Sequence, residues 1–274
     1  SIKFFDHYQN QIYEQTIRYG LKELNIKTIS LGHYHSLHSV NYLPYVYSSN
    51  EWSSKLKPDY ITCSNNICEE KLISQGVPKS RIKIISDLQR EAFINFDLKK
   101  NDSKNLLIIL SLFPESNYEI LSKILKIKDF ISNELGLKVT IRSHPYVDSL
   151  KILKKLKIKN LPDNWRWSDQ DLYTDLKNNY CVVTMHSAVV TDVIYFNCAL
   201  IVLKSELNVA ENYLDFLENE FEVLKPTYDE NLEIRLKEIY FSKKNYYQNE
   251  FLKLKNKLNL RVDKNSYIKL QELK

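Results

Sequence analysis

The sequence predicts an α/β fold made of two Rossmann-like domains that face each other across a cleft. Short β-branched and apolar runs alternate with amphipathic helical stretches along most of the 274 residues, a pattern typical of parallel sheets covered by helices. A polar stretch near Asp97–Lys104 interrupts this alternation and indicates a linker. We therefore expect an N-terminal domain over residues 1–98, a C-terminal domain over 105–240 and a basic helical segment over 241–274.

The N-terminal domain is expected to alternate strands and helices in the order that parallel sheets require. Its helices should be Gln11–Leu24, in which Ile12, Ile17, Leu21 and Leu24 recur near helical spacing, and one capped by Ser64 that ends near Gln75-Gly76. Its strands should be Ile2–Phe5, Ile26–Leu31, Asp59–Cys63 and Arg81–Ser86. Because Ser1 already lies inside a strand-like run, this domain is expected to be truncated.

The C-terminal domain restarts the same alternation after the linker. The expected strands are Leu106–Leu110, Lys138–Ser143, Trp165–Trp167, Tyr180–Thr184 and Ala199–Leu203. The expected helices are Ser116–Leu135, Ser149–Leu156, Asp169–Asn178 with Ser168 as its cap, Ser187–Phe196, Val209–Glu218, Asn231–Tyr240 and Lys244–Leu258.

Composition and charge are those of an ordinary globular protein, with 43% hydrophobic and 27% charged residues. The net charge of +5 permits an anionic substrate or an anionic membrane surface and does not require nucleic acid as a partner. The four cysteines show no CxxC spacing, which favours reduced, buried thiols over disulfides or a metal site. We therefore expect a cytoplasmic protein, with a peripheral contact at the inner face of the membrane as an option.

Two strand-to-loop junctions carry the residues that best suit a binding site. The first is Arg142-Ser143-His144-Pro145, after the run that begins at Lys138, and the second is His186-Ser187-Ala188. Ligands of open α/β sheets bind just outside the carboxyl ends of strands, and a helix N-terminus at Ser187 would attract phosphate. The two junctions therefore predict one site for an anionic ligand, although Ser187 as a plain helix cap and His144 as a structural histidine are the simpler alternatives.

The N-terminal domain offers candidates for chemistry on the other side of the cleft. His33, His35 and His38 follow a strand within a short loop, but this spacing without a nearby Cys or carboxylate is a weak zinc signature. His33 is therefore expected to line the cleft, and no metal or other cofactor is expected. Glu14 lies in the first turns of its helix, where it either faces the cleft or is simply exposed to solvent.

Several short segments resemble bacterial surface-carbohydrate glycosyltransferases of the GT-B type. The resemblance covers most of residues 8–203 and rests on Tyr13-Glu14-Gln15, Gly20-Leu21-Lys22, Ile29 to His33, Glu51-Trp52, Pro58 to Ile61, Gly76-Val77-Pro78 and Arg81-Ile82. In that family the strand ends in a Gln-His pair, of which Gly32-His33 keeps only the histidine. Arg142 to Pro145 looks like the HP motif of sialyl-, polysialyl- and Kdo-transferases and of CDP-glycerol glycerophosphotransferases, and Ser187-Ala188 resembles their serine-led phosphate-binding helix.

The resemblance implies a metal-independent glycosyltransferase of capsule or lipopolysaccharide synthesis. It would move a sugar from a CMP-linked donor, such as Kdo or a sialic-like ulosonic acid, onto a surface polysaccharide or lipooligosaccharide. Arg142, His144 and the Ser187 helix would hold the donor phosphate, while Glu14 or His33 would act near the sugar as base or nucleophile.

Three other functions stay open. The first is a CDP-glycerol-type phosphotransferase of teichoic-acid-like polymers, and the second is a non-catalytic glycan-binding or assembly subunit. A sugar-nucleotide epimerase is disfavoured because paired acidic residues are not evident. The basic segment Phe241–Lys274 either packs back over the domains or lies against anionic lipid.

Overall fold

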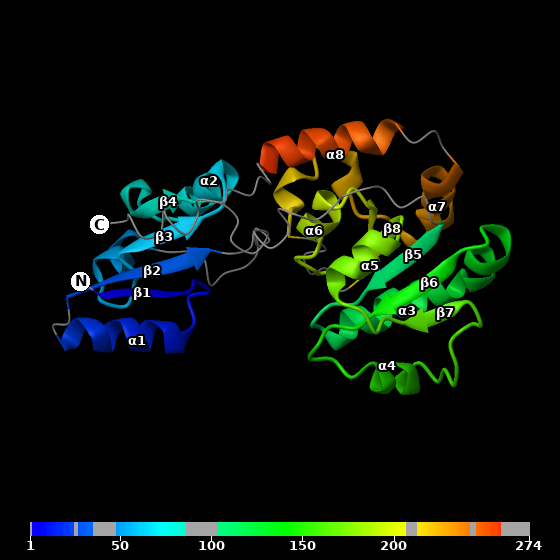
Figure 1. The fold of residues 1–274 in the computed structure, drawn as a ribbon, viewed down its shortest axis with the longest axis horizontal. Helices are drawn as coiled ribbons and strands as arrows, with labels where there is room; N and C mark the ends of the chain where they lie inside the picture. The colour runs from blue at the N-terminus through cyan, green and yellow to red at the C-terminus, as the bar shows by residue number, and fades with distance from the viewer. Residues whose placement is uncertain are drawn as a thin grey trace. The chain divides into compact units, whose positions relative to one another are not determined.

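The computed structural model of the chain describes residues 2–24, 27–34, 48–85, 104–206, 213–241 and 245–258. The chain divides into two compact units. Unit 1 comprises Ser1–Asp97 together with Lys255–Lys274, and unit 2 comprises Leu98–Leu254. Each unit contains its own sheet of parallel strands (Figure 1), so the chain has the expected α/β fold with two Rossmann-like domains.

Unit 1 is built on four parallel strands in the order β1-β2-β3-β4. The strands are β1 (Ile2–His7), β2 (Thr28–Tyr34), β3 (Tyr60–Cys63) and β4 (Ile82–Ile84). The helices are α1 (Ile12–Glu23) and α2 (Asn66–Ser74), with short 3₁₀ turns at Ser49–Ser53 and Lys79–Arg81.

Two predictions about the boundaries in unit 1 are corrected by the structure. Strand β2 continues through Tyr34, so Gly32 and His33 lie inside the sheet rather than in a loop. The cap of α2 is Asn65, whose Oδ1 accepts a hydrogen bond from the Cys68 amide at 2.9 Å, and not Ser64. An asparagine satisfies a free amide of the first turn in the same way as a serine.

Helix α1 packs with the opposite face from the one that its apolar periodicity predicts. Its buried residues are Glu14 and Arg18, whereas Ile12 is 82% exposed and Leu24 is 72% exposed. The helix itself was correctly predicted, and buried ion pairs rather than apolar contacts hold its inner face.

Unit 2 contains a five-stranded parallel sheet in the order β7-β6-β5-β8-β9. Its strands are β5 (Asn105–Ile109), β6 (Lys138–Arg142), β7 (Trp165–Trp167), β8 (Cys181–Thr184) and β9 (Ala199–Val202). Its helices are α3 (Pro114–Lys126), α4 (Ser149–Lys155), α5 (Leu172–Asn178), α6 (Val190–Tyr195), α7 (Leu232–Phe241) and α8 (Asn245–Leu258, which runs across the boundary into unit 1). This order is that of a Rossmann fold, in which the chain reverses its direction of travel next to the first strand.

Several helices of unit 2 are shorter than their apolar patterns predict. Helix α3 ends at Lys126 and a separate π-helical turn spans Phe130–Glu134, where one long helix was expected. Asp171 rather than Ser168 caps α5 through hydrogen bonds from the amides of Tyr173 and Thr174. The expected helix at Val209–Glu218 lies partly outside the described residues, and its described part holds only a 3₁₀ turn.

Apolar side chains on one face of the sheet pack against helices and form a core of unit 2. The strands contribute Leu106, Ile108, Val139, Ile141, Val183 and Ile201, and the helices contribute Ile120, Ile124, Leu232 and Leu236. All four cysteines of the chain are buried thiols outside any disulfide. Helix α8 buries Phe251, Leu254 and Leu258, so the described part of the basic C-terminal segment packs against the fold through its apolar side. Among the described residues, none of the helices combines the length and apolarity that crossing a membrane requires.

Candidate functional site

The candidate site of unit 2 lies where three loops leave the carboxyl ends of neighbouring strands. From β5 the chain moves to β6 on one side, and it later returns to β8 on the other side. Such a reversal leaves a crevice between the loops, and ligands of Rossmann folds bind there. The loops that follow β5, β6 and β8 contain Ser111, His144 and Ser187 respectively, so the two predicted junctions do share one edge of one sheet.

The loop after β6 positions His144 with a defined tautomer. The Nδ1 atom of His144 accepts a hydrogen bond from the Tyr146 amide at 3.3 Å, so its proton is carried by Nε2. The partial burial of the ring lowers the pKa of His144 below its ordinary value. At neutral pH the residue is therefore an uncharged imidazole whose Nε2–H is a hydrogen-bond donor.

Ser143 supplies a second polar group at the same place. Its hydroxyl oxygen is shielded from solvent and has no hydrogen-bond partner among the described residues. Buried hydroxyls without a partner are uncommon in folded proteins and call for an explanation. A ligand oxygen bound at the end of β6 would satisfy this group.

The guanidinium of Arg142 is bound by other groups of unit 2. Its Nη1 donates to Asp175 Oδ2 at 2.8 Å and to the Gln170 carbonyl at 2.7 Å. Asp175 is 3% exposed and also accepts a hydrogen bond from the Ser168 hydroxyl at 2.6 Å. The expectation that Arg142 holds a phosphate is untested, but these contacts favour a role in fixing the loop on α5.

The loop after β8 differs from the helix start that the sequence predicts. Helix α6 begins at Val190, and the Ser187 hydroxyl accepts a hydrogen bond from the Val189 amide at 3.3 Å in the preceding turn. The prediction that the helix begins at Ser187 is therefore wrong, whereas the binding of phosphate by Ser187 stays a prediction. Ser187 and Ala188 instead lie in the turn that leads from β8 to α6.

His186, at the start of this turn, has a φ of 53°, which is uncommon for a residue with a side chain, although histidine adopts it more readily than most. Its buried ring meets Phe113 edge-to-face, with centroids 6.4 Å apart. This contact joins the loop after β5 to the loop after β8.

Two buried polar groups that sequence reasoning missed hold the surrounding loops. The Asn117 side chain accepts from the Ser111 amide at 2.7 Å and donates to the Ser111 carbonyl at 2.9 Å, which fixes the loop after β5. Lys123 Nζ contacts Asp229 Oδ1 at 2.6 Å and the Lys204 carbonyl at 2.9 Å, which fixes the segment after β9. Burial lowers the pKa of Lys123, but hydrogen bonds and charge from Asp229 and Glu119 outweigh it, so the net pKa is raised. Neither Asn117 nor Lys123 lies in a motif, and α3 holds other polar residues such as Ser116 and Glu119, so no sequence signal distinguishes these two.

In unit 1 the predicted residue His33 lies on β2 and is 3% exposed. Its Nδ1 is 3.0 Å from the Thr62 hydroxyl, and its ring stacks on Phe5 with centroids 5.8 Å apart. His35 and His38 lie outside the described residues. Within the described part of the chain, no three His, Cys, Asp or Glu side chains gather as metal ligands would.

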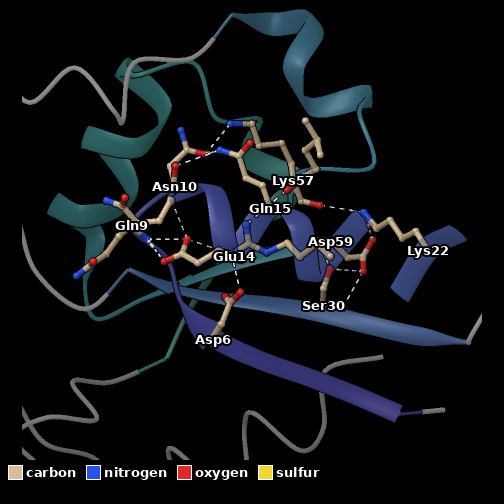
Figure 2. A network of polar contacts seen from close by, with 12 residues as sticks. Asp6, Gln9, Asn10, Glu14, Gln15, Lys22, Ser30, Lys57 and Asp59 are labelled. Atoms are coloured by element: carbon tan, nitrogen blue, oxygen red, sulfur yellow. Dashed lines mark hydrogen bonds and ion pairs between the residues drawn. The ribbon is translucent and has the colours of Figure 1, made fainter. Parts of the chain in front are cut away.

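Glu14 is buried rather than exposed, at 1% exposure. Both of its carboxylate oxygens accept from the Gln9 amide at 3.2 Å, and its Oε2 lies 3.5 Å from Arg18 (Figure 2). Asp6, which pairs with Arg18, is the neighbour of His7 on β1, and His7 is in register with His33 on β2. Because successive strand residues point to opposite faces, Glu14 and His33 lie on opposite faces of this sheet and do not form one constellation.

Comparison with known proteins places the fold but not the family. No family model matches the chain, and no curated protein matches it. Several solved structures are similar to it in fold. The UDP-GlcNAc 2-epimerase of Methanocaldococcus jannaschii, in complex with UDP-GlcNAc and UDP, has a TM-score of 0.56 and 14% identity, covering 94% of this chain and 76% of that one.

Two further structures were also solved with UDP. HepE of Anabaena, in complex with UDP and glucose, has a TM-score of 0.53 and 11% identity, covering 94% of this chain and 76% of that one. MnaA of S. aureus with UDP has a TM-score of 0.51 and 15% identity, covering 96% of this chain and 75% of that one. At such identities the similarity confirms the GT-B-type fold class alone.

Proposed function

We propose that the chain is a nucleotide-sugar-dependent glycosyltransferase whose donor binds at the carboxyl edge of β5, β6 and β8. The observation that carries the proposal is the pair Ser143 and His144, which presents a shielded hydroxyl without a partner and an imidazole Nε2–H at the reversal point of the sheet. Both are hydrogen-bond donors, and a phosphate oxygen is the acceptor that suits them.

The chemistry expected of this edge is the stabilisation of a leaving phosphate. When the bond between the sugar and the phosphate breaks, negative charge grows on the phosphate oxygen. Donors that are already oriented toward that oxygen lower the barrier without reorganising. His144 is oriented by the Tyr146 amide, and its loop is fixed by the ion pair of Arg142 with Asp175. The edge therefore combines hydrogen-bond donors with a rigid support.

The nucleotide of the proposed sugar donor is uridine diphosphate. Three of the structures with the same fold were solved with UDP, which favours UDP over the CMP-linked ulosonic acid that the motif resemblance implies. A surface polysaccharide or lipooligosaccharide stays the predicted acceptor. Glu14 and His33 stay predictions as catalytic groups, and the buried hydrogen bonds of Glu14 favour a structural role for it.

Nucleotide binding tests the proposal directly. Titration calorimetry and thermal shift with UDP, CDP, CMP and GDP should show binding of UDP in preference to the others. His144→Ala and Ser143→Ala should each weaken it, whereas Lys151→Ala, a change at an exposed lysine of α4, should not. If none of the four nucleotides binds, the proposal is wrong and a non-catalytic assembly subunit becomes the better explanation. If CMP binds best, the donor is the ulosonic acid type.

A sugar-nucleotide epimerase is the second candidate, and the fold similarity to the M. jannaschii epimerase favours it. The two reactions differ in their products. Incubation with UDP-GlcNAc, followed by NMR, should show release of UDP for transfer to an acceptor or to water. Formation of the C2 epimer with the UDP still attached would identify an epimerase instead.

A further inference from the structure

A hollow of about 490 Å³ lies at the amino-terminal edge of the sheet of unit 2. It is lined by the end of α3, the π-helical turn Phe130–Glu134 and the segment 158–164 that leads into β7. The candidate nucleotide site lies at the other edge, where the strands end. Strand β6 has five residues, so at about 3.3 Å per residue the two edges are about 15 Å apart. The hollow is therefore a separate place, and its volume is within the range of roughly 300–1,000 Å³ that small-molecule sites have.

A chain of side-chain hydrogen bonds fixes the base of the hollow. The indole Nε1–H of Trp165 donates to the Ser132 hydroxyl at 3.1 Å, and that hydroxyl donates to Asn164 Oδ1 at 3.0 Å. Asn164 Nδ2 in turn donates to the Leu137 carbonyl at 2.6 Å. Ser132 lies in the π-helical turn, a rare conformation that is frequent at functional sites. The base thus presents polar groups whose orientation is already set, as binding sites require.

The segment that leads into β7 supplies aliphatic side chains to the hollow. These side chains are half-buried and belong to Ile158, Leu161 and Pro162. The backbone that carries them is fixed, since the Ile158 amide donates to the Leu153 carbonyl at 3.0 Å and the Trp165 amide donates to the Pro162 carbonyl at 2.9 Å. A ligand with a face of C–H groups can pack against this surface without reorganising it.

Three polar side chains of the hollow are not used by the protein itself. Asn133, Asn160 and Asp163 are exposed and have no hydrogen bond or ion pair with another described residue. Each amide offers donors and an acceptor, and the carboxylate accepts at both oxygens. Sugar hydroxyls, each of which donates and accepts, match such a set, and the pyranose ring adds the face of C–H groups that the aliphatic side chains require.

The charges and the backbone of the hollow favour this ligand over an anion or a peptide. Its charged side chains are Lys128, Asp129 and Asp163, so two carboxylates and one ammonium would repel a phosphate or a uronate. A peptide is commonly bound by its backbone at a free strand edge, whereas none of the described residues that line the hollow lies in a strand.

We propose that this hollow binds a neutral saccharide. The C–H face of the sugar packs on the aliphatic segment 158–162, and its hydroxyls bind the side chains of Asn133, Asn160 and Asp163. The binding does not depend on the proposed glycosyl transfer, because the residues of the nucleotide edge do not line the hollow. Its consequence does rest on the proposed function: a second saccharide site about 15 Å from the site of transfer would hold a growing glycan between additions.

The indole of Trp165 offers a local reporter, because it donates to Ser132 at the base of the hollow. The chain has three tryptophans, so a proton–nitrogen correlation spectrum of the full chain contains three indole signals, and Trp165→Phe assigns one of them. Titration with maltotriose, cellotriose and chitotriose, all uncharged, should shift the Trp165 signal with at least one of these sugars. The signals of Trp52 and Trp167 should stay in place, and UDP, which tests the nucleotide edge, should not move the Trp165 signal.

Two variants and a control separate binding in the hollow from binding elsewhere. Asn133→Ala and Asp163→Ala should each raise the Kd of the sugar about fivefold, the loss expected of one hydrogen bond. Neither side chain has a described partner, so both variants should keep the melting temperature of the wild type. Asp169→Ala, at an exposed aspartate after β7, is the matched control and should leave the Kd unchanged.

The same titrations can contradict the proposal. A Trp165 signal that stays in place with all three sugars would overturn it, and so would an unchanged Kd in both Asn133→Ala and Asp163→Ala. Inorganic phosphate and trialanine serve as the competing probes. If either of them shifts the Trp165 signal and the sugars do not, the hollow binds an anion or a peptide and the proposal is wrong.

Discussion

The role of His144 as an uncharged hydrogen-bond donor to the nucleotide can be tested by substitution. We expect His144→Ala to weaken UDP binding about fivefold, since one hydrogen bond contributes on the order of 1 kcal/mol. His144→Gln should recover part of the loss because its amide also donates. Calorimetry at pH 7.5 measures both affinities. Equal affinities for the wild type and both variants would remove His144 from the site.

The lowered pKa of His144 also sets a pH dependence of stability. The unfolded histidine takes up a proton near its ordinary pKa of 6.5, whereas the folded residue takes it up only at lower pH. The unfolded state therefore binds more protons in that range, and stability falls as the pH falls below about 6.5. Urea unfolding at pH 7.5 and pH 5.5 should show a smaller loss in His144→Gln than in the wild type.

Arg142 is expected to act through its ion pair rather than by touching the ligand. Asp175→Asn should destabilise unit 2 by about 3 kcal/mol, because it leaves the arginine without its buried charge partner. The double variant Arg142→Met with Asp175→Leu should regain much of that stability. If UDP affinity stays within a few-fold in the double variant, Arg142 positions the loop. A loss of two orders of magnitude would show that its guanidinium binds phosphate.

At the scale of elements, the strands were easier to predict than the polar turns between them. Trp165–Trp167 has the predicted boundaries, because its bulky residues stand between clear turn signals. The start of α6 was misplaced because serine is a typical helix-capping residue. The left-handed backbone of His186, which precedes the later helix start, cannot be recognised from the sequence.

Orientation was harder to predict than the existence of an element. For α1, the spacing of Ile12 and Ile17 predicts a helix but not which side of it faces the sheet. The deciding contact, between Arg18 and Asp6, joins residues twelve positions apart. For the candidate site, the position of Ser143 and His144 at a strand end followed from the sequence, whereas Asp175, which anchors Arg142, comes from a distant helix with no motif.

The inner face of α1 predicts an unequal response of two glutamates on one helix. Glu14→Gln should lower the free energy of unfolding by about 2 kcal/mol, since hydrogen bonds to a buried charged group are the stronger ones. Glu23→Gln, at an exposed ion pair, should leave stability nearly unchanged. Urea titration at one protein concentration measures both. Full stability of Glu14→Gln with a collapse of kcat would instead support Glu14 as a catalytic base.

At the scale of the whole molecule, two compact units with separate sheets predict unfolding in more than one step. The three tryptophans divide between the units, with Trp52 in unit 1 and Trp165 and Trp167 in unit 2. Trp52→Phe therefore leaves fluorescence that reports on unit 2. The double variant Trp165→Phe with Trp167→Phe leaves fluorescence that reports on unit 1.

A ligand that binds the edge formed by β5, β6 and β8 should raise only the unfolding midpoint of unit 2. At a UDP concentration of a hundred times its Kd, the free energy of unfolding of unit 2 should rise by about 2.7 kcal/mol. The fluorescence of Trp52→Phe should show this shift, and that of the double variant Trp165→Phe with Trp167→Phe should not. An equal shift in both variants would contradict a site built from unit 2 alone, since binding energy would then be shared with unit 1. Because the position of the nucleotide is the premise of the proposed transfer reaction, this experiment tests that premise without needing the acceptor.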